Sequence, residues 1–408
     1  MLLVYNAGIA VYNAGIKVFS LFNKKADLLQ KGRRETAQEI KSLDFTDKTI
    51  WVHCASLGEF EQGRPLIEKI KEKYPEKVVV LTFFSPSGYE VRKDYELADY
   101  VFYLPADRKK QVKKFVDAIN PEVVIFVKYE FWYHFLTYLN SKSIKTYIVS
   151  AIFRPEHAFF KWYGKWYQKM LRLFTRMYVQ DEESARLLDS IGIVNYQVAG
   201  DTRFDRVWEI ARASKEYPEL EEFAKNSKVL VGGSSWPAGE KLIAEYLKTN
   251  SDVKLLLAPH EIHEEHLKEI ESLLPLASAR YTKLDGVNLS SLRVMIIDTM
   301  GMLSSMYRYG DAAYIGGGFG SGIHNTIEAS TFGLPVVFGP NYKKYKEACD
   351  LVDLNAGFSV SDQEGFNTIM DKLLKDQSFL DEASKQSVEY VEKMRGATSI
   401  VMNEIGFD

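Results

Sequence analysis

Cysteine is scarce in this chain. Only Cys54 and Cys349 occur among 408 residues. Two cysteines cannot build a disulfide framework or a cysteine-rich zinc site, and this scarcity is typical of proteins in a reducing compartment.

A large excess of charge and a metal-binding motif are also lacking. The formal net charge of −3 at pH 7 argues against a general nucleic-acid binder. Histidine is rare, although His260, His263 and His266 fall within one short segment. Because this segment lacks the His-Glu-x-x-His order of a zinc-binding helix, we predict a solvated helix there rather than a metal site.

Apolar runs of strand length are abundant and alternate with longer helical runs. Hydrophobic residues make up 46% of the chain and charged residues 26%, as in packed globular proteins. Continuous apolar strands separated by helices predict parallel sheets covered on both faces, which bind ligands at the carboxyl ends of their strands. The expected strands are residues 49–54, 78–84, 100–104, 123–127, 146–150, 228–231, 253–257, 294–297, 311–315 and 336–338.

This alternation, together with the length of the chain, predicts two Rossmann-like α/β domains that face each other across a cleft. The expected boundaries are residues 1–35 for an N-terminal helix, 36–210 for the first domain, 211–227 for a linker, 228–375 for the second domain and 376–408 for a helical tail.

A glycine-rich stretch, residues 316–329, follows one apolar strand of the second domain. Residues 323–332 contain neither proline nor glycine, so we predict a helix directly after the loop. Glycines let a ligand approach the backbone, and a helix N-terminus attracts anions. His324, Asn325 and Glu328 follow the loop, and the Glu328 carboxylate suits a sugar's hydroxyl groups. These residues favour a nucleotide-sugar site over the alternative, a turn that only packs a helix on a sheet.

The N-terminal segment contains an exact repeat, because residues 4–9 and 11–16 share the sequence Val-Tyr-Asn-Ala-Gly-Ile. The seven-residue offset places Val4, Val11 and Val18 on one helical stripe, and cations follow from Lys24 onward. We therefore expect a helix that lies in the cytoplasmic membrane face. The alternative is a helix buried on the protein itself or in a dimer seam.

Residues 155–175 alternate aromatic and basic side chains. Two interpretations remain open: a helix that meets a membrane or an acylated substrate, and a core helix whose lysines reach the solvent.

Several loops at the predicted strand ends together resemble the 3-deoxy-D-manno-oct-2-ulosonic acid (Kdo) transferase family of lipid A biosynthesis. The matching segments are residues 56–59, 86–89, 104–107, 130–132, 200–205, 298–301 and 316–328. Each motif is weak alone, but their order and spacing are specific and span nearly the whole chain.

The resemblance implies a GT-B fold and an inverting, metal-independent transfer of Kdo from CMP-Kdo to lipid IVA, without a cofactor. It places the protein at the cytoplasmic face of the bacterial inner membrane, with the acceptor on the first domain and the donor on the second, and implies no nucleic-acid partner. The alternatives are another GT-B nucleotide-sugar enzyme, such as a lipid glycosyltransferase or an epimerase, and a non-catalytic nucleotide-sugar-binding membrane protein.

Candidate roles follow from the matching motifs. Glu59 is the candidate general base, unless it only complements a helix dipole, and Glu130 would orient the acceptor or a nearby loop. Asn325 and Glu328 would hold ribose hydroxyl groups. Further acceptor-side candidates are Ser56, Gly58, Ser85, Ser87, Arg154 and Arg203. Further donor-side candidates are Gly233, Ser234, Pro259, His260, Met300, Gly301, His324 and, for their amides facing the departing CMP, Gly317, Gly318, Gly320 and Ser321.

The chain departs from the family pattern at three places. The family commonly has Pro-Arg-His where this chain has Pro259-His260-Glu261, and Lys128 and Met302 stand where acids are usual. One expected cation is therefore missing, and the candidates to compensate for it are Arg154, Arg203 and Lys343.

Overall fold

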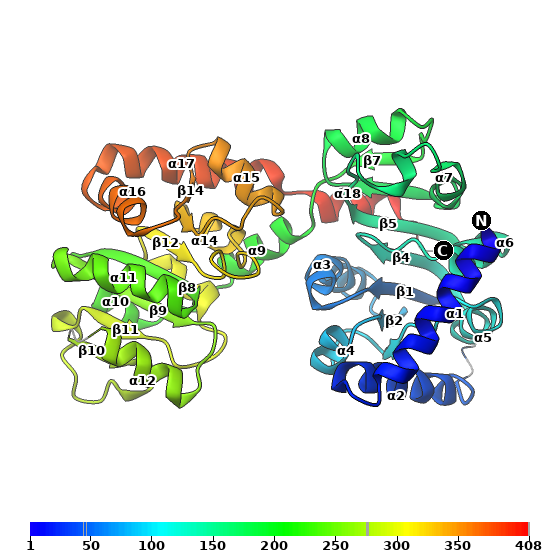
Figure 1. Ribbon diagram of the computed structural model, residues 1–408, viewed down its shortest axis with the longest axis horizontal. Helices are drawn as coiled ribbons and strands as arrows, with labels where there is room; N and C mark the ends of the chain where they lie inside the picture. Colours follow the sequence, from blue (N-terminus) through cyan, green and yellow to red (C-terminus); the bar gives the residue numbers. More distant parts are fainter. Residues whose placement is uncertain (44, 46, 275–276, 407–408) are drawn as a thin grey trace. The chain divides into compact units, whose positions relative to one another are not determined.

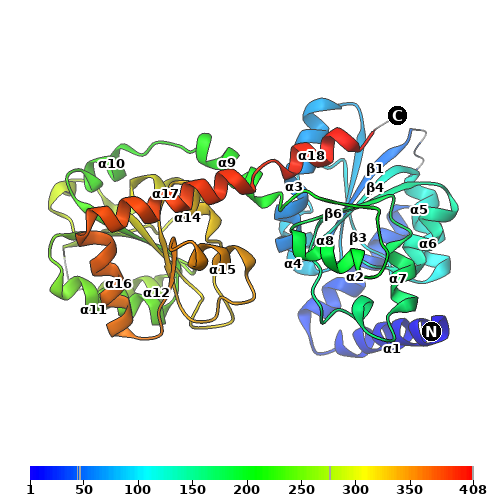
Figure 2. The same cartoon turned by 90° about the horizontal axis from the view of Figure 1, so that it is seen from above.

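The computed structural model describes residues 1–43, 45, 47–274 and 277–406. The chain divides into two compact units. Unit 1 comprises Met1–Arg206 and Arg395–Asp408, and unit 2 comprises Val207–Met394. Each unit has a sheet covered by helices, as Figures 1 and 2 show.

Over the described residues, the sheet of unit 1 has the strand order β3-β2-β1-β4-β5-β6-β7, and its neighbouring strands are parallel. The order reverses between β1 and β4, and ligands of open α/β sheets bind at the carboxyl ends of strands at such a point. The strands are β1 (Thr49–Cys54), β2 (Val78–Phe83), β3 (Tyr100–Tyr103), β4 (Pro121–Val127), β5 (Lys145–Ala151), β6 (Arg176–Val179) and β7 (Tyr196–Val198).

Helices cover both faces of this sheet, with α3 on one side and α5 and α6 on the other (Figure 1). Trp51 of β1 is fully buried and contacts Phe115 and Phe135 on one face. Its neighbour Val52 packs with Phe60 on the other face, which explains the continuous apolar strand. The helices are α1 (Leu2–Phe19), α2 (Lys24–Glu39), α3 (Leu57–Lys73), α4 (Pro86–Arg92), α5 (Lys109–Ile119), α6 (Tyr133–Ser141), η1 (Ala158–Phe160), α7 (Lys165–Leu171), α8 (Glu182–Asp189) and α18 (Ala397–Glu404).

The described part of unit 2 has a second parallel sheet, in the order β10-β11-β9-β8-β12-β13-β14, and its order reverses between β8 and β12. The strands are β8 (Lys228–Ser235), β9 (Val253–Pro259), β10 (Ser278–Arg280), β11 (Val294–Ile296), β12 (Ala312–Ile315), β13 (Val336–Phe338) and β14 (Gly357–Ser359). Helices α11, α12, α16 and α17 contribute to the main core of this unit.

The helices of unit 2 are α10 (Pro218–Ala224), α11 (Pro237–Thr249), α12 (Glu264–Leu273), η2 (Tyr281–Lys283), η3 (Leu289–Ser291), α13 (Leu303–Met306), η4 (Tyr307–Tyr309), α14 (Ile327–Thr331), α15 (Lys346–Asp353), α16 (Gln363–Lys375) and α17 (Gln377–Met394). Helix α9 (Arg203–Arg212) begins in unit 1 and ends in unit 2.

Three segments differ in detail from the expected boundaries. The expected linker, residues 211–227, contains α10, which buries Leu220 and Phe223 within unit 2. The expected tail is divided, since α17 belongs to unit 2 and α18 packs against α3 in unit 1. The expected single N-terminal helix is two helices, and Gly32 of α2 packs directly against the ring of Tyr103.

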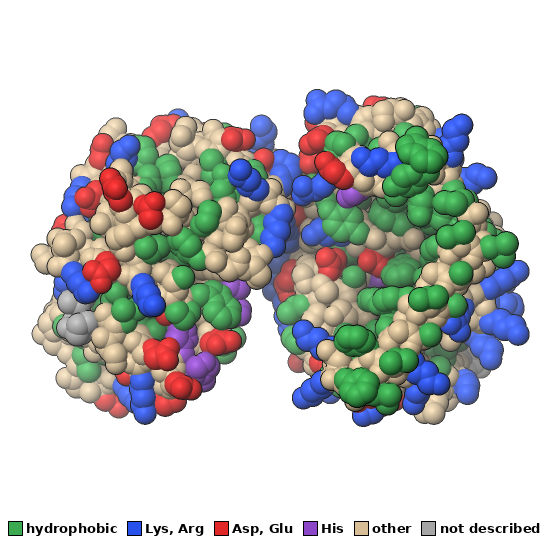
Figure 3. Space-filling model, in the orientation of Figure 1, with side chains coloured by type: hydrophobic (Ala, Val, Ile, Leu, Met, Phe, Trp, Pro, Cys, Tyr) green, Lys and Arg blue, Asp and Glu red, His purple; other side chains and the backbone are tan. Residues whose placement is uncertain are grey.

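The repeat in α1 gives this helix two different faces. Tyr5 donates a hydrogen bond to Asp107 (2.5 Å), and Tyr12 stacks on Phe84 with ring centroids 6.2 Å apart. The stripe of Val4, Val11 and Val18 is instead 67%, 72% and 60% exposed, and the green side chains of α1 cross the surface in Figure 3. Helix α1 is long and apolar enough to cross a membrane by length and composition, and none of its residues is buried. The alternative prediction, that this stripe is buried against unit 1, is therefore wrong.

Most of the aromatic segment 155–175 belongs to the core of unit 1. Phe159, Leu171 and Phe174 are buried, and a 3₁₀ turn and the short helix α7 replace the expected single helix. Trp162 is the exception within this segment, because its side chain is 92% exposed.

Candidate active site

The Glu59 carboxylate lies where β1 ends and α3 begins, at the reversal of strand order. Ser56 is the N-cap residue of α3, where its hydroxyl oxygen accepts from the Gly58 amide (3.3 Å) and its O–H donates to Glu59 Oε2. Glu59 is in the first turn, where the helix dipole stabilises a carboxylate. Half-exposed and oriented by Ser56, this carboxylate can accept a proton from a ligand.

The loop after β2 lies beside the Glu59 loop. The Ala55 carbonyl accepts from the amides of Phe84 (3.2 Å) and Ser85 (2.7 Å). Ser85 caps α4, and its hydroxyl lies 2.9 Å from that of Ser87. The two predicted serine hydroxyl groups are thus grouped on a loop that is hydrogen-bonded to the residue before Ser56.

Glu130 is buried beyond the end of β4 and is only 6% exposed. Two donors converge on its Oε2 atom: the indole N–H of Trp132, and Nε2 of His53 at 2.9 Å. His53 is fully buried in β1, the strand that pairs with β4. Two N–H donors stabilise a carboxylate and orient its other oxygen, Oε1.

Thr82 on the neighbouring strand β2 contacts the other ring nitrogen of His53. Its hydroxyl oxygen accepts from Trp51 Nε1 (2.8 Å) and lies 2.8 Å from His53 Nδ1, and its carbonyl oxygen lies 3.1 Å from the same nitrogen. The Nε2 atom of His53 faces the Glu130 carboxylate, which accepts a hydrogen bond from it. This buried chain positions Glu130 from behind.

A phenol and a guanidinium complete the polar groups near Glu59. Burial raises the pKa of Tyr129, the Arg154 guanidinium bonded to its phenol opposes this rise, and the Glu59 carboxylate adds to it. Arg154 and Glu59 therefore lie within electrostatic reach of the same phenol. Lys128 has a positive φ of 71°, and its ammonium lies 5.5 Å from the centre of the Tyr129 ring.

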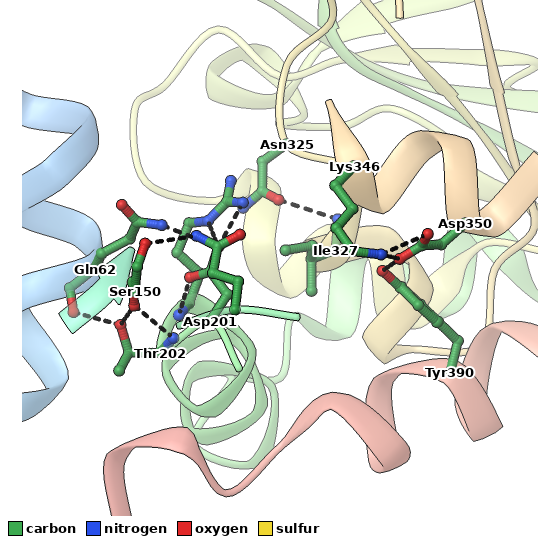
Figure 4. A network of polar contacts seen from close by, with 11 residues as sticks. Gln62, Ser150, Asp201, Thr202, Asn325, Ile327, Lys346, Asp350 and Tyr390 are labelled. Atoms are coloured by element: carbon green, nitrogen blue, oxygen red, sulfur yellow. Dashed lines mark hydrogen bonds and ion pairs between the residues drawn. The ribbon is translucent and has the colours of Figure 1, made fainter. Parts of the chain in front are cut away.

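Asp201, which is labelled in Figure 4, holds Arg203 near the end of the first segment of unit 1. Two nitrogens of the Arg203 guanidinium lie 2.9 and 2.8 Å from Asp201 Oδ2, which also accepts from Gln62 (2.9 Å). Burial by itself would raise the pKa of Asp201, but the Arg203 guanidinium and these hydrogen bonds hold it below its usual range. The buried Asp201 thus anchors the Arg203 side chain.

Unit 2 contains a pocket of about 500 Å³ beside the glycine-rich loop. Its lining residues are Trp236, Pro237, Ala238, Gly239, His260, Tyr314, Gly317, Phe319, Gly320, Ser321, Gly322 and His324. The volume suits a small polar molecule with an aromatic ring.

Three stacked rings form part of the wall of this pocket. The His260 ring is 4.7 Å from Trp236 and 4.5 Å from His324, in near-parallel orientation. Trp236 donates its indole N–H to His324 Nε2 (3.0 Å), so that the proton of a neutral His324 lies on Nδ1. Burial and, secondarily, the His260 ring lower the pKa of His324. The three rings therefore form a continuous aromatic surface on one wall of the pocket.

Close backbone contacts explain the glycines of the loop. A Cβ on Gly316 would lie 1.9 Å from the Ser234 carbonyl oxygen, and one on Gly318 would lie 2.5 Å from the Gly339 amide. Gly317 has a φ of 89°. Of the expected anion-binding amides, that of Gly320 donates to the Gly317 carbonyl (2.9 Å) and is not available to a ligand. The amides of Gly317, Gly318 and Ser321 have no such partner within the described residues.

The predicted helix after this loop is shorter than expected. Helix α14 begins at Ile327 because the Asn325 side-chain oxygen accepts from the Ile327 amide at 3.0 Å (Figure 4). His324 and Glu328 are therefore not on one helical face, and the prediction of a helix N-terminus at the glycine loop is wrong. Asn325 also donates to Glu328 Oε1 (2.9 Å), so these two form a separate pair outside the pocket wall.

Comparisons with known proteins agree with this geometry. Residues 26–206 match the family model described as 3-deoxy-D-manno-octulosonic-acid transferase (kdotransferase). The 3-deoxy-D-manno-octulosonic acid transferase of Chlamydia trachomatis is 29% identical over 345 residues, 81% of this chain and 79% of that protein. Its counterpart in Aquifex aeolicus is 26% identical over 367 residues, 87% of this chain and 95% of that protein. The chain is therefore similar to Kdo transferases over most of its length, and its first 206 residues include the match to the family model.

The solved structures agree with the predicted fold class. UDP-GlcNAc 2-epimerase from Neisseria meningitidis superposes with a TM-score of 0.61 at 15% identity, covering 87% of this chain and 98% of that one. This similarity, with the two parallel sheets, confirms two Rossmann-like domains of the GT-B class. By its similarity to the Kdo transferases the protein is a glycosyltransferase, and this similarity supports Kdo transfer in lipopolysaccharide biosynthesis.

The structure brings some of the predicted site residues together and leaves others apart. On unit 1, the loops that carry Ser56, Gly58, Glu59, Ser85 and Ser87 are adjacent. On unit 2, the predicted residues that line the pocket are His260, Gly317, Gly320, Ser321 and His324. The others lie outside its wall: Gly233, Ser234, Pro259, Met300, Gly301, Gly318, Asn325 and Glu328.

Met300 and Pro259 are two predicted donor-side residues that lie outside the pocket wall. Met300 is 77% exposed on the loop after β11, two strands away from β8 in the sheet. Pro259 is the last residue of β9 and pairs with Ser235. Gly233 instead makes room for the buried Tyr307 hydroxyl, which lies 2.1 Å from a Cβ built on Gly233.

Sequence reasoning missed His53, Thr82 and Trp236. The available signal for the first two was a polar residue inside an otherwise apolar strand, directly before a candidate loop. The histidine segment is structural in part, since the buried His266 contacts Glu240 (3.1 Å), which also accepts from Ser235. Among the described residues, no group of His, Cys, Asp and Glu has the arrangement of a metal site.

Proposed function

We propose that this protein transfers Kdo from CMP-Kdo to lipid IVA. The observation that carries the proposal is the Glu59 carboxylate, oriented by Ser56 at the reversal of strand order and close to the buried Glu130 loop. A family that transfers a sugar to a hydroxyl group requires a base at the acceptor site, and the partly exposed Glu59 carboxylate suits this role.

In the proposed reaction, Glu59 takes the proton of the acceptor hydroxyl group as its oxygen forms a bond to the anomeric carbon of Kdo. The bond between that carbon and the phosphate oxygen breaks, and its electron pair leaves with CMP. Attack opposite to the leaving group inverts the anomeric configuration. The Glu130 Oε1 atom would hold the acceptor, because Oε2 is already engaged by His53 and Trp132.

The pocket of unit 2 would bind CMP-Kdo. The aromatic wall of Trp236, His260 and His324 offers a stacking surface for the cytosine ring. The amides of Gly317 and Ser321, which line the pocket, would face the single phosphate, with help from Lys343 of the same unit. The exposed stripe of α1 would lie on the cytoplasmic face of the inner membrane, where the lipid acceptor is found.

The test is an incubation of the purified protein with CMP-Kdo and lipid IVA in detergent, followed by mass spectrometry of the lipid. We expect a mass increase of one or more Kdo residues, and no product with UDP-sugars. Turnover of a UDP-sugar without Kdo transfer would favour another nucleotide-sugar enzyme. Binding of CMP without any turnover would indicate a non-catalytic nucleotide-sugar binder.

A further inference from the structure

A second cavity in unit 1 lies between α1, α2 and α5, outside the site described above. Its volume is about 980 Å³, and its apolar lining includes Ala10, Ala14 and Pro105. The basic side chains that line it are Lys17, Arg33, Arg34, Lys41, Arg108 and Lys114. No Asp or Glu is present among the described lining residues.

The cations around this cavity lack counter-charges. Within the part of the chain that the structure describes, Lys17, Lys41, Arg108 and Lys114 form no ion pair. A hollow lined by one sign of charge concentrates counter-ions of the opposite sign. The charge of its lining residues therefore favours an anionic ligand in this cavity.

Arg33 forms a fixed part of the wall. Its Nε donates to the Leu104 carbonyl (2.9 Å) and its Nη1 to Asn13 Oδ1 (3.3 Å). Burial lowers its pKa to about 10, so the guanidinium remains charged at neutral pH. Asn13, the second asparagine of the N-terminal repeat, thus joins α1 to the cavity wall through Arg33.

The cavity adjoins the exposed apolar stripe of α1. Ala10, Ala14 and Lys17 face the cavity, and at 100° per residue this flank lies next to the stripe of Val4, Val11 and Val18. Blue side chains gather beside the green surface of α1 in Figure 3. If the stripe enters the apolar layer of a membrane, the cavity lies at the level of the lipid headgroups.

We propose that this cavity binds the phosphate of an anionic bilayer phospholipid, whose acyl chains run along the apolar stripe of α1. The proposal rests on the membrane placement of α1 given above. Lipid IVA also carries phosphate, but none of the acceptor-side candidate residues lines this cavity. This favours a bilayer lipid as the occupant, although Arg33 of the cavity wall lies over the ring of Phe84, which stacks on Trp132.

The experiment compares two charge-matched double variants of exposed residues at the start of α5. Arg108→Gln with Lys114→Gln removes two cations of the cavity. Lys109→Gln with Lys110→Gln removes two cations that do not line it. Flotation is measured with phosphatidylcholine vesicles and with vesicles of phosphatidylcholine mixed with phosphatidylglycerol.

We expect the cavity variant to lose about thirtyfold in partitioning to the phosphatidylglycerol vesicles, from the effect of two cations near an anionic surface. The matched control should lose less than about fivefold, and binding to phosphatidylcholine alone should be equal in all proteins. Equal losses in both variants would overturn the proposal, because they would indicate a diffuse surface attraction and no site.

A Kdo-transfer assay in neutral detergent separates the bilayer lipid from the acceptor. The cavity variant should keep the kcat and the KM for lipid IVA of the unaltered protein. A raised KM for lipid IVA in detergent would overturn the proposal, since the cavity would then hold the acceptor's phosphate. Absence of transfer by the unaltered protein would refute the proposed function, and the flotation difference between the two variants would still decide for or against the cavity.

Discussion

Replacing Glu59 by Gln tests the central chemical assignment. The amide keeps the size of the side chain, and its oxygen can still accept the Ser56 hydroxyl hydrogen bond. Loss of a general base costs about two to four orders of magnitude in rate, equivalent to about 2.7–5.4 kcal/mol in the activation barrier. Because Glu59 is half-exposed in the first turn of α3, we expect the fold to survive with a loss of at most about 1 kcal/mol in stability.

The assay combines steady-state Kdo transfer with calorimetric titration of CMP. Glu59→Gln should lose turnover but bind CMP normally, because the proposed donor contacts are on unit 2. Ser56→Ala should have an intermediate effect, about tenfold in rate, since it removes one hydrogen bond to the base and leaves the carboxylate in place.

Glu130→Gln is the comparison that can refute this reasoning. Glu130 is buried and bonded to His53 and Trp132, so that its amide variant keeps an oxygen for both donors. If Glu59→Gln retains near-normal turnover and Glu130→Gln loses it, the base is Glu130. If neither substitution lowers turnover, the catalytic assignment to unit 1 is wrong.

Four further outcomes are expected. Thr82→Val should lower the free energy of unfolding by about 1–3 kcal/mol in urea titration, because it leaves the buried Trp51 N–H without its acceptor; an unchanged midpoint would contradict this. The depressed pKa of Asp201 contributes stability that is present above its unfolded pKa of about 3.9 and is lost as the pH falls through its lower folded value. Asp201→Asn should therefore flatten the fall of the melting temperature at acidic pH. An unaltered fall would argue against a stabilising ion pair between Asp201 and Arg203. Deletion of residues 1–22 should release the protein from vesicles at high salt, and retention would place the membrane contact elsewhere. Kdo transfer should persist in EDTA, since CMP carries one phosphate; complete loss that magnesium restores would contradict metal independence.

Most strands could be predicted because their signal is local. The central strands are buried on both faces and are therefore continuously apolar, as in residues 49–54, and their ends follow from the polar loops. The edge strands β7, β10 and β14 are short and partly exposed, so they lack this signal and were not predicted. Helix α14 could not be placed in the same way. Its start depends on the Asn325 side chain, which bonds the Ile327 amide in place of a continuing helical turn.

The candidate site was only partly accessible to sequence reasoning. Glu59 and Ser56 are three residues apart, so their contact follows from one helix turn. His53 and Glu130 are 77 residues apart and meet because β1 pairs with β4. Trp236 likewise reaches His324 across 88 residues. Motif spacing carries no information about such pairs, which depend on the strand order.

The amino-acid sequence by itself determined the α/β class, the strand-end loops and the stripe of Val4, Val11 and Val18, because periodicity and glycine content act over a few residues. Only the tertiary structure decided that this stripe is exposed, since Tyr5 of the repeat is hydrogen-bonded to Asp107 and Tyr12 stacks on Phe84. It also decided which glycines line a pocket and which only allow close packing. The physical reason is that burial and hydrogen bonding are properties of groups that folding brings together.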